Sequence, residues 1–247
     1  TPVSNANWLS INPGNGTLTG TPPGPAGNAV FDVTVTDTAG QSNTKTFTLG
    51  MINAPATTAL PFYDDFSSSA SGWTGLVGGT GWNIAGAAGE GGTPTGGQGN
   101  PGPTADADGT PAGGILGYNF LGNYQANLNN VAVLSPIILV NGRPSIEVSF
   151  SRWLNVQNRP WDFATFDYAL NSGAWVTLYK NPVNSNPIVN DSSWQFIDSS
   201  VLPSLLITTT GAHHIQFRFT LTTNSSSHYA GWHVDNFRVG AVPVAGV

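Results

Sequence analysis

Cation binding is the chemistry that the acidic residues of this chain suggest first. Three aspartates alternate with large apolar residues along predicted strands: Asp64 with Phe62 and Phe66, Asp162 with Phe166, Tyr168 and Leu170, and Asp235 with Phe237 and Val239. Alternate residues of a strand point to one face, so these carboxylates are predicted to face the core. A buried carboxylate needs a cation or several hydrogen-bond donors, and gathered carboxylate oxygens favour Ca²⁺. The sequence thus predicts structural Ca²⁺ at Asp64, Asp65 and Asp235, with Asp162 a further candidate.

The alternative for each aspartate is a turn cap or an ion pair, for which Arg152, Arg218 and Arg238 are available.

The sequence offers less support for catalysis. His213 and His214 are adjacent on a predicted strand and point to opposite faces, so they cannot grip one ion together. The chain has no cysteine, and no motif locates a serine or threonine nucleophile beside a base. We therefore expect no enzymatic activity.

Aromatic side chains offer a second binding chemistry, because the faces of Trp and Tyr stack on sugar rings. The candidates are Trp153, Trp161, Trp175, Trp194 and Tyr229. Most tryptophans of a β-sandwich fill its core. Trp153 stands out because it is out of phase with Ile146, Val148 and Phe150, which predicts that it lies on the outer face.

The composition favours an exported protein. Charged residues make up 8% of the 247 residues, while the chain holds 31 glycines and 18 prolines. A formal charge of −6 with only seven Lys and Arg argues against nucleic-acid binding. No apolar run reaches the roughly 20 residues of a membrane span. Absence of cysteine fits a secreted bacterial protein of this size, so we expect an extracellular or cell-surface location.

Apolar residues alternate along the chain, which predicts an all-β protein. Turn-forming residues divide it into a first domain at 1–53, a linker at 54–60, a second domain at 61–240 and an apolar tail at 241–247. A tract rich in Gly and Pro spans residues 86–114. Structureless loops of this length are uncommon in compact domains, so we expect the tract to pack on something, such as a neighbouring chain.

The first domain resembles a known family. Residues 7–37 contain Trp-Leu-Ser-Ile, then Gly-Thr-Leu-Thr-Gly-Thr-Pro and Val-Phe-Asp-Val-Thr-Val-Thr-Asp. This pattern is similar to the second half of the Ig-like, cadherin-like repeats of bacterial surface proteins. The resemblance implies an incomplete Ig-like β-sandwich whose earlier strands would cover Phe31, Val33, Val35, Phe47 and Leu49. Either the chain was cut from a longer protein or another chain supplies the strand, for which the tail Val239–Val247 is a candidate donor.

The second domain resembles the MAM-like jelly rolls of bacterial surface-anchored proteins. The motifs run in order from Tyr-Asp-Asp-Phe at residue 63, through Ser-Ile-Glu-Val-Ser-Phe-Ser-Arg-Trp-Leu at residue 145, to Gly-Trp-His-Val-Asp-Asn-Phe at residue 231. The resemblance implies a jelly-roll β-sandwich that binds or adheres without catalysis.

Two functional interpretations follow. The first is an extracellular structural subunit of a filament, sheath or surface layer that associates with copies of itself by β-strand addition. The alternative is a carbohydrate- or protein-binding module of a larger secreted enzyme or adhesin.

Overall fold

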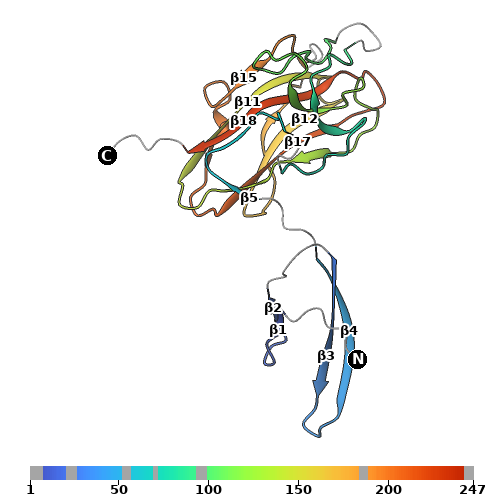
Figure 1. Ribbon diagram of the computed structural model, residues 1–247, viewed down its shortest axis with the longest axis vertical. Helices are drawn as coiled ribbons and strands as arrows, with labels where there is room; N and C mark the ends of the chain where they lie inside the picture. Colours follow the sequence, from blue (N-terminus) through green and yellow to red (C-terminus); the bar gives the residue numbers. More distant parts are fainter. Residues whose placement is uncertain are drawn as a thin grey trace, which may run out of the picture. The chain divides into compact units, whose positions relative to one another are not determined.

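The computed structural model describes residues 8–20, 27–51, 57–68, 72–92, 99–183 and 189–241. Within these ranges the protein is all-β, as predicted, and its one helical element is the 3₁₀ turn Pro203–Leu205 (Figure 1). No helix of the described ranges is long and apolar enough to cross a bilayer. The chain divides into two compact units, residues 1–55 and 56–247.

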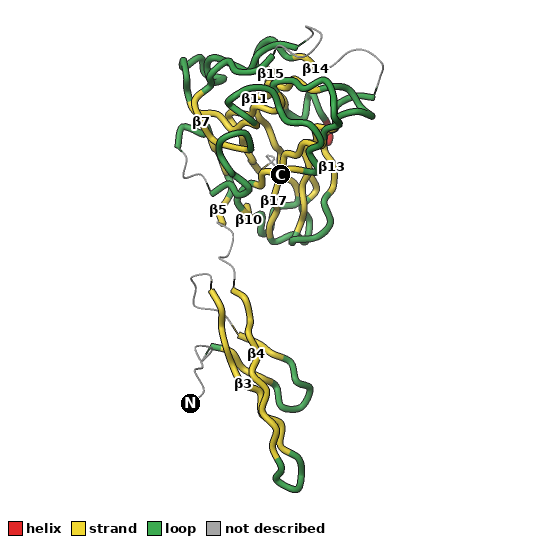
Figure 2. Tube along the Cα trace, turned by 90° about the vertical axis from the view of Figure 1, so that its right-hand side faces the viewer, coloured by secondary structure: helices red, strands yellow, loops and turns green. Residues whose placement is uncertain are grey.

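The first unit contains two antiparallel hairpins. Strand β1 (Leu9–Ile11) pairs with β2 (Leu18–Gly20), and β3 (Gly27–Thr36) pairs with β4 (Ser42–Met51) along ten residue pairs (Figure 2). The turn after β3 is fixed by Asp37, whose Oδ1 accepts hydrogen bonds from two backbone N–H groups of the turn, each at 2.9 Å. Each hairpin is a two-stranded sheet in the part of the unit that the structure describes.

The second unit is a β-sandwich of two sheets. Its strands are β5 (Thr57–Ala59), β6 (Phe62–Asp64), β7 (Trp82–Gly86), β8 (Gly114–Tyr118), β9 (Val131–Leu134), β10 (Ile137–Leu139), β11 (Ser145–Val156), β12 (Phe163–Leu170), β13 (Val176–Lys180), β14 (Val189–Asn190), β15 (Gln195–Ile197), β16 (Leu206–Thr208), β17 (His214–Thr222) and β18 (Gly231–Ala241). One sheet, here the β12 sheet, has the order β13-β12-β17-β10-β5, with β9 also on β17. The other, the β11 sheet, has the order β14-β11-β18-β8-β7, with β6, β15 and β16 attached at its sides.

The connectivity is that of a jelly roll. The chain crosses to the β12 sheet between β11 and β12, and returns to the β11 sheet for β14, β15 and β16. It crosses again before β17 and returns between β17 and β18, while β12 pairs with β17 and β11 with β18 (Figure 1). Phenylalanines from all four strands meet between the sheets, with Phe166 stacked on Phe219 at 4.5 Å between ring centroids. Phe150, Phe166, Phe219 and Phe237 are at most 1% exposed. Burial of such side chains contributes roughly 1.5–3 kcal/mol each.

The predicted linker at 54–60 is partly wrong. Residues Thr57–Ala59 form strand β5, which pairs in parallel with Ile137–Leu139 of β10 and belongs to the second unit. A short polar stretch such as this can add to a sheet edge because the ladder needs only backbone donors and acceptors. Its side chains therefore carry little signal of a strand.

The Gly- and Pro-rich tract packs on its own domain, so the expected neighbouring chain is not needed to hold it. The indole N–H groups of Trp153 and Trp194 donate to the carbonyl oxygens of Pro101 and Ala105, each at 3.0 Å. Gly102 lies so close to the sheet that a Cβ there would come within 3.0 Å of the His233 ring. The described part of the tract thereby covers the outer face of the β11 sheet.

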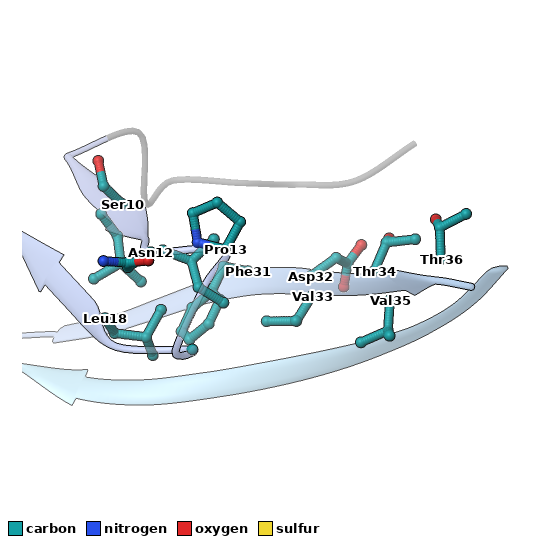
Figure 3. A pocket seen from close by; sticks show the side chains of 13 residues that line it. Ser10, Asn12, Pro13, Leu18, Phe31, Asp32, Val33, Thr34, Val35 and Thr36 are labelled. Carbon is teal, nitrogen blue, oxygen red and sulfur yellow. The ribbon is translucent and has the colours of Figure 1, made fainter. Parts of the chain in front are cut away.

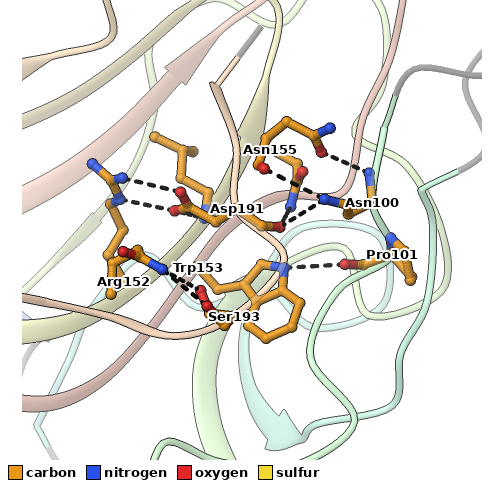
Figure 4. A network of polar contacts seen from close by, with 10 residues as sticks. Asn100, Pro101, Arg152, Trp153, Asn155, Asp191 and Ser193 are labelled. Carbon is orange, nitrogen blue, oxygen red and sulfur yellow. Dashed lines mark hydrogen bonds and ion pairs between the residues drawn. The ribbon is translucent and has the colours of Figure 1, made fainter.

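A polar network holds the covering tract in place at Asn100 (Figure 4). Asp191 accepts from Arg152 Nε at 2.9 Å and Nη2 at 3.1 Å, and from the Leu154 N–H at 2.9 Å. The Asp191 carbonyl oxygen accepts from the side-chain amides of Asn155 and Asn100. The network therefore joins β11, the segment after β14 and the covering tract through one residue.

Candidate functional site

The outer face of the β12 sheet carries a shallow groove of about 340 Å³. Its lining residues are Asn130, Phe163, Thr165, Asp167, Thr177, Lys180, Arg218, Thr220 and Thr222. Eight of these nine side chains carry hydrogen-bonding groups, so the groove is polar around a single aromatic ring. No covering segment comparable to the Gly- and Pro-rich tract lies on these residues in the described chain, since Lys180 is exposed and Phe163, Thr165, Arg218 and Thr222 are partly exposed.

Strand alternation explains the polar face. On β12, Thr165 and Asp167 point outward while Ala164 and Phe166 are fully buried. On β17, Thr220 and Arg218 lie directly opposite Thr165 and Asp167 in the register. Two neighbouring strands with the same inside-outside pattern thus give one continuous outward row of polar side chains.

A β-bulge adds the third strand to this face. Thr177 and Lys180 of β13 are three residues apart, a spacing that would place them on opposite faces of a regular strand. The register between β12 and β13 shifts between Phe166 and Asp167, so Lys180 pairs with Thr165 and Thr177 with Asp167. The extra residue turns both side chains toward the groove.

Asp167 organises the floor of the groove. Its carboxylate accepts from Thr177 Oγ1 at 2.6 Å, from Thr165 Oγ1 at 3.1 Å and from Arg218 Nε at 2.9 Å, where it also forms an ion pair. The Arg218 guanidinium lies 4.3 Å from the ring centroid of Trp175. The threonine hydroxyls hold the Asp167 carboxylate, and this carboxylate and the Trp175 ring hold the Arg218 guanidinium. The position of Arg218 is therefore fixed before any ligand binds.

Hydroxyl and amide groups flank this floor. Thr165 Oγ1 and Thr220 Oγ1 are 2.6 Å apart, and Thr222 Oγ1 donates to Asn130 Oδ1 at 3.0 Å. Phe163 presents a partly exposed ring at the end of the groove where β12 begins. Hydrogen-bonding groups beside an aromatic ring can bind a molecule that has polar edges and an apolar face.

The aromatic residues predicted to bind sugars differ in exposure and contacts. Trp161 is 56% exposed and stands two residues before Phe163. Trp153 lies on an outer face as predicted, but its ring packs against Trp194 at 5.8 Å and its N–H is bonded to the covering tract. Tyr229 is buried in the core beside Tyr124. Trp175 supports Arg218, so Trp161 is the candidate of the original five that keeps a large exposed face.

The aspartates predicted to bind Ca²⁺ use protein donors. Asp64 accepts from the Trp73 indole N–H and the Phe66 N–H, both at 2.9 Å. Asp65 is exposed and accepts from the Ser67 side chain. Asp162 is fully buried and accepts from Tyr124 Oη at 2.6 Å and the Asn224 N–H at 2.8 Å, and burial raises its pKa. The described residues hold no group of three His, Cys, Asp or Glu side chains arranged for a metal ion, and Ca²⁺ stays a prediction from the sequence.

Asp235 lies on the other face from the one its sequence phase predicts. Along β18, Asp235 pairs with Ser151 and Arg238 with Ser149, so β18 has one residue more than β11 between these pairs. The bulge, at which Asn236 has a φ of 51°, turns Asp235 outward under the covering tract, where it accepts from the Ala107 N–H at 2.8 Å. Burial, with Asp106 and Asp108 nearby, raises the Asp235 pKa to about 6.

The predicted strand-acceptor face of the first unit lines a groove of about 690 Å³ (Figure 3). Phe31, Val33 and Val35 share one side of β3, and Leu9, Ile11 and Leu18 lie across from them. Val35 is 68% and Phe47 42% exposed, and Phe31 stacks on Phe47 at 5.8 Å.

The side chain of Leu49 and the tail residues 242–247 lie outside the described part of the chain. Val239–Ala241, the first part of the proposed donor, belongs to β18 of the second unit and pairs with Ile146–Val148. Strand donation by another chain stays a prediction.

The residues of the polar groove were not predicted as a site. The available signal was the outward phase of β17, in which Gln216, Arg218, Thr220 and Thr222 alternate with buried Phe217, Phe219 and Leu221. The bulge that adds Lys180 has no comparable signature in the sequence.

Comparisons with known proteins cover both units. The profile of the family described as "Putative Ig domain" matches residues 7–51, which confirms the resemblance of the first unit. A solved structure of carbohydrate-binding modules from the β-sandwich superfamily aligns with 13% identity and a TM-score of 0.38, covering 94% of this chain and 85% of that one. SGBP-B from a complex xyloglucan utilization locus in Bacteroides uniformis aligns with 12% identity and a TM-score of 0.35, covering 97% of this chain and 63% of that one. No curated protein matches the chain.

Proposed function

We propose that the second unit is a non-catalytic carbohydrate-binding module and that the groove on the β12 sheet is its binding site. The observation that carries the proposal is the difference between the two outer faces of the sandwich. The Gly- and Pro-rich tract covers the face of the β11 sheet through Trp153 and Trp194, whereas the polar face of the β12 sheet is open. Among the described residues of the second unit, the second of these faces is the one that a glycan can reach.

The chemistry of the groove suits a sugar. A pyranose ring offers hydroxyl groups around its edge and a C–H face that packs on aromatic rings. The groove supplies hydroxyl, amide and charged groups from Thr165, Asn130 and Arg218 beside the ring of Phe163, and Trp161 stands exposed nearby. The fixed ion pair and hydroxyl network lower the cost of ordering these groups when a ligand binds.

The proposal places the protein outside the cell, where polysaccharides are found, and it favours a binding module over a filament subunit. The low content of charged residues, 8%, fits both interpretations, so it does not decide between them. The groove on the β12 sheet favours the binding module, because self-association by strand addition would make no use of it.

Affinity electrophoresis and isothermal titration calorimetry with a panel of soluble polysaccharides test the proposal. We expect retardation by at least one polysaccharide, and a loss of affinity of about tenfold for Phe163→Ala, which corresponds to the removal of one aromatic contact. Phe196→Ala is the matched control, since Phe196 is 60% exposed on β15 of the other sheet. Equal affinity of Phe163→Ala and the wild-type protein for the bound glycan would place the site elsewhere.

A further inference from the structure

We infer that the groove on the β12 sheet selects acidic saccharides, that is, glycans whose sugar residues carry carboxylate groups. This inference rests on the proposed function and names the ligand class of the same site. It starts from the distribution of charge in a protein that is acidic as a whole, with a formal charge of −6 and seven Lys and Arg.

The groove is locally cationic. Two of the seven cationic residues, Lys180 and Arg218, are among its lining residues, and Asp167 is the acidic one. Asp167 forms an ion pair with Arg218 at 2.9 Å, which balances one charge of each sign. Lys180 is exposed and has no ion pair among the described residues, so the groove keeps an uncompensated positive charge.

Asp167 does not repel an anionic ligand at close range. Its side chain is 3% exposed, and its oxygens already accept from two threonine hydroxyls and from Arg218. The Arg218 side chain, by contrast, is 29% exposed and donates to this carboxylate only through its Nε. Its terminal nitrogens therefore remain as donors, and a guanidinium fork matches the two oxygens of a carboxylate.

The two cations lie on opposite sides of the groove. β13 and β17 both neighbour β12, and adjacent strands are roughly 4.8 Å apart, so Lys180 and Arg218 stand on strands about 10 Å apart. The hydroxyl of Thr165, on β12, lies between these two strands and is 2.6 Å from the hydroxyl of Thr220, which is on the same strand as Arg218. A sugar chain in the groove would thus meet neutral hydrogen-bonding groups in the middle and a cation on either side, where a carboxylate substituent projects.

The test compares acidic polysaccharides with neutral derivatives of the same backbone. Polygalacturonate and its methyl ester, and alginate and hyaluronan with their carboxyl-reduced forms, are titrated against the full chain by calorimetry. We expect the acidic form of the bound pair to be preferred by about tenfold, with a preference that weakens as salt is raised.

Variants assign this preference to the groove. Lys180→Ala is expected to lower affinity for the acidic form about fivefold more than affinity for the neutral form, while Lys180→Arg retains the preference. Lys45→Ala, a lysine of the first unit, is the matched control. The melting temperature should not change in Lys180→Ala, because this side chain is exposed.

Two outcomes overturn the inference in distinguishable ways. If a neutral form binds as tightly as its acidic partner, or Lys180→Ala keeps the preference, acidic selection by the groove is wrong and the proposed carbohydrate binding stands. If neither form of any pair binds, and the neutral polysaccharides of the first panel also fail, both proposals fall.

Discussion

Replacing Asp235 by Asn should stabilise the protein at neutral pH. Asp235 is 1% exposed, and its carboxylate accepts from the N–H groups of Ala107 and Asn236 with no cation beside it in the described structure. Burial raises its pKa from 3.8 to about 6, with the charges of Asp106 and Asp108 contributing. Asn keeps an oxygen for the Ala107 N–H and removes the buried charge, whereas its NH2 group faces the Asn236 N–H and loses that bond.

The sign of the effect follows from proton linkage. Between about pH 4 and 6 the folded protein binds the Asp235 proton more tightly than the unfolded chain does, so the ionised carboxylate costs stability above pH 6 and the cost disappears as the pH falls to 4. A shift of about two pKa units corresponds to at most about 3 kcal/mol. Partial solvent screening, relaxation and the lost bond to the Asn236 N–H reduce our expectation to about 1 kcal/mol.

In the wild-type protein, the titration of His233 offsets the effect of Asp235 on the pH dependence of stability. Its ring is buried against Phe120 and the covering tract, and desolvation lowers its pKa from 6.5 to about 4. The unfolded chain therefore binds the His233 proton more tightly between about pH 4 and 6.5, so this group makes stability rise with pH. Asp235 and His233 oppose each other over nearly the same range, and their sum should be shallow.

Urea denaturation followed by tryptophan fluorescence at several pH values tests these signs, because seven of the eight tryptophans belong to the second unit. The free energy of unfolding of Asp235→Asn minus that of wild type should be constant below pH 4, rise to pH 6 and level off. Asp65→Asn, an exposed carboxylate, should not show the rise. If this difference in the free energy of unfolding does not change with pH, the reasoning is refuted. If Asp235→Asn is less stable than wild type at pH 7 and loses a stabilising effect of Ca²⁺, the reasoning is also refuted and a metal site is favoured.

Two further predictions concern the segment that covers the β11 sheet. Asp191→Asn should lower the free energy of unfolding by about 2–3 kcal/mol, because Arg152, 17% exposed at its side chain, loses its partner. Urea denaturation measures this, and the double variant Arg152→Met with Asp191→Leu should recover part of it. Trp153→Phe should cost about 1 kcal/mol through loss of the bond to Pro101, whereas Trp161→Phe should cost nothing measurable in the same assay, since Trp161 is 56% exposed.

Strand alternation could be predicted because it depends on neighbouring residues only. The inward phase of Phe217 and Phe219 in β17, and that of Phe31 and Val33 in β3, follows from a period of two. The same reasoning predicted an all-β chain. The Ig-like resemblance came from the motifs at residues 7–37, and the family profile, which matches residues 7–51, confirms it. It also placed Trp153 correctly on an outer face.

Alternation failed wherever a bulge interrupts it. At Asn236 one extra residue turns Asp235 outward, and in β13 one extra residue brings Lys180 into line with Thr177. A bulge is stabilised by the pairing of its strand with a partner, here β11 and β12, that lies far away in the sequence. Its position is therefore a property of the assembled sheet.

The sequence by itself determined where most strands lie, β5 excepted, and which side of each regular strand is apolar. Only the tertiary structure decided which polar face is open, because composition marks residues 86–114 as rich in Gly and Pro but does not say which sheet they cover. That choice depends on backbone carbonyls meeting the indole groups of Trp153 and Trp194 across the fold. Such contacts join residues distant in the sequence, so Trp153 lies beneath the covering tract and the groove around Asp167 is left open among the described residues.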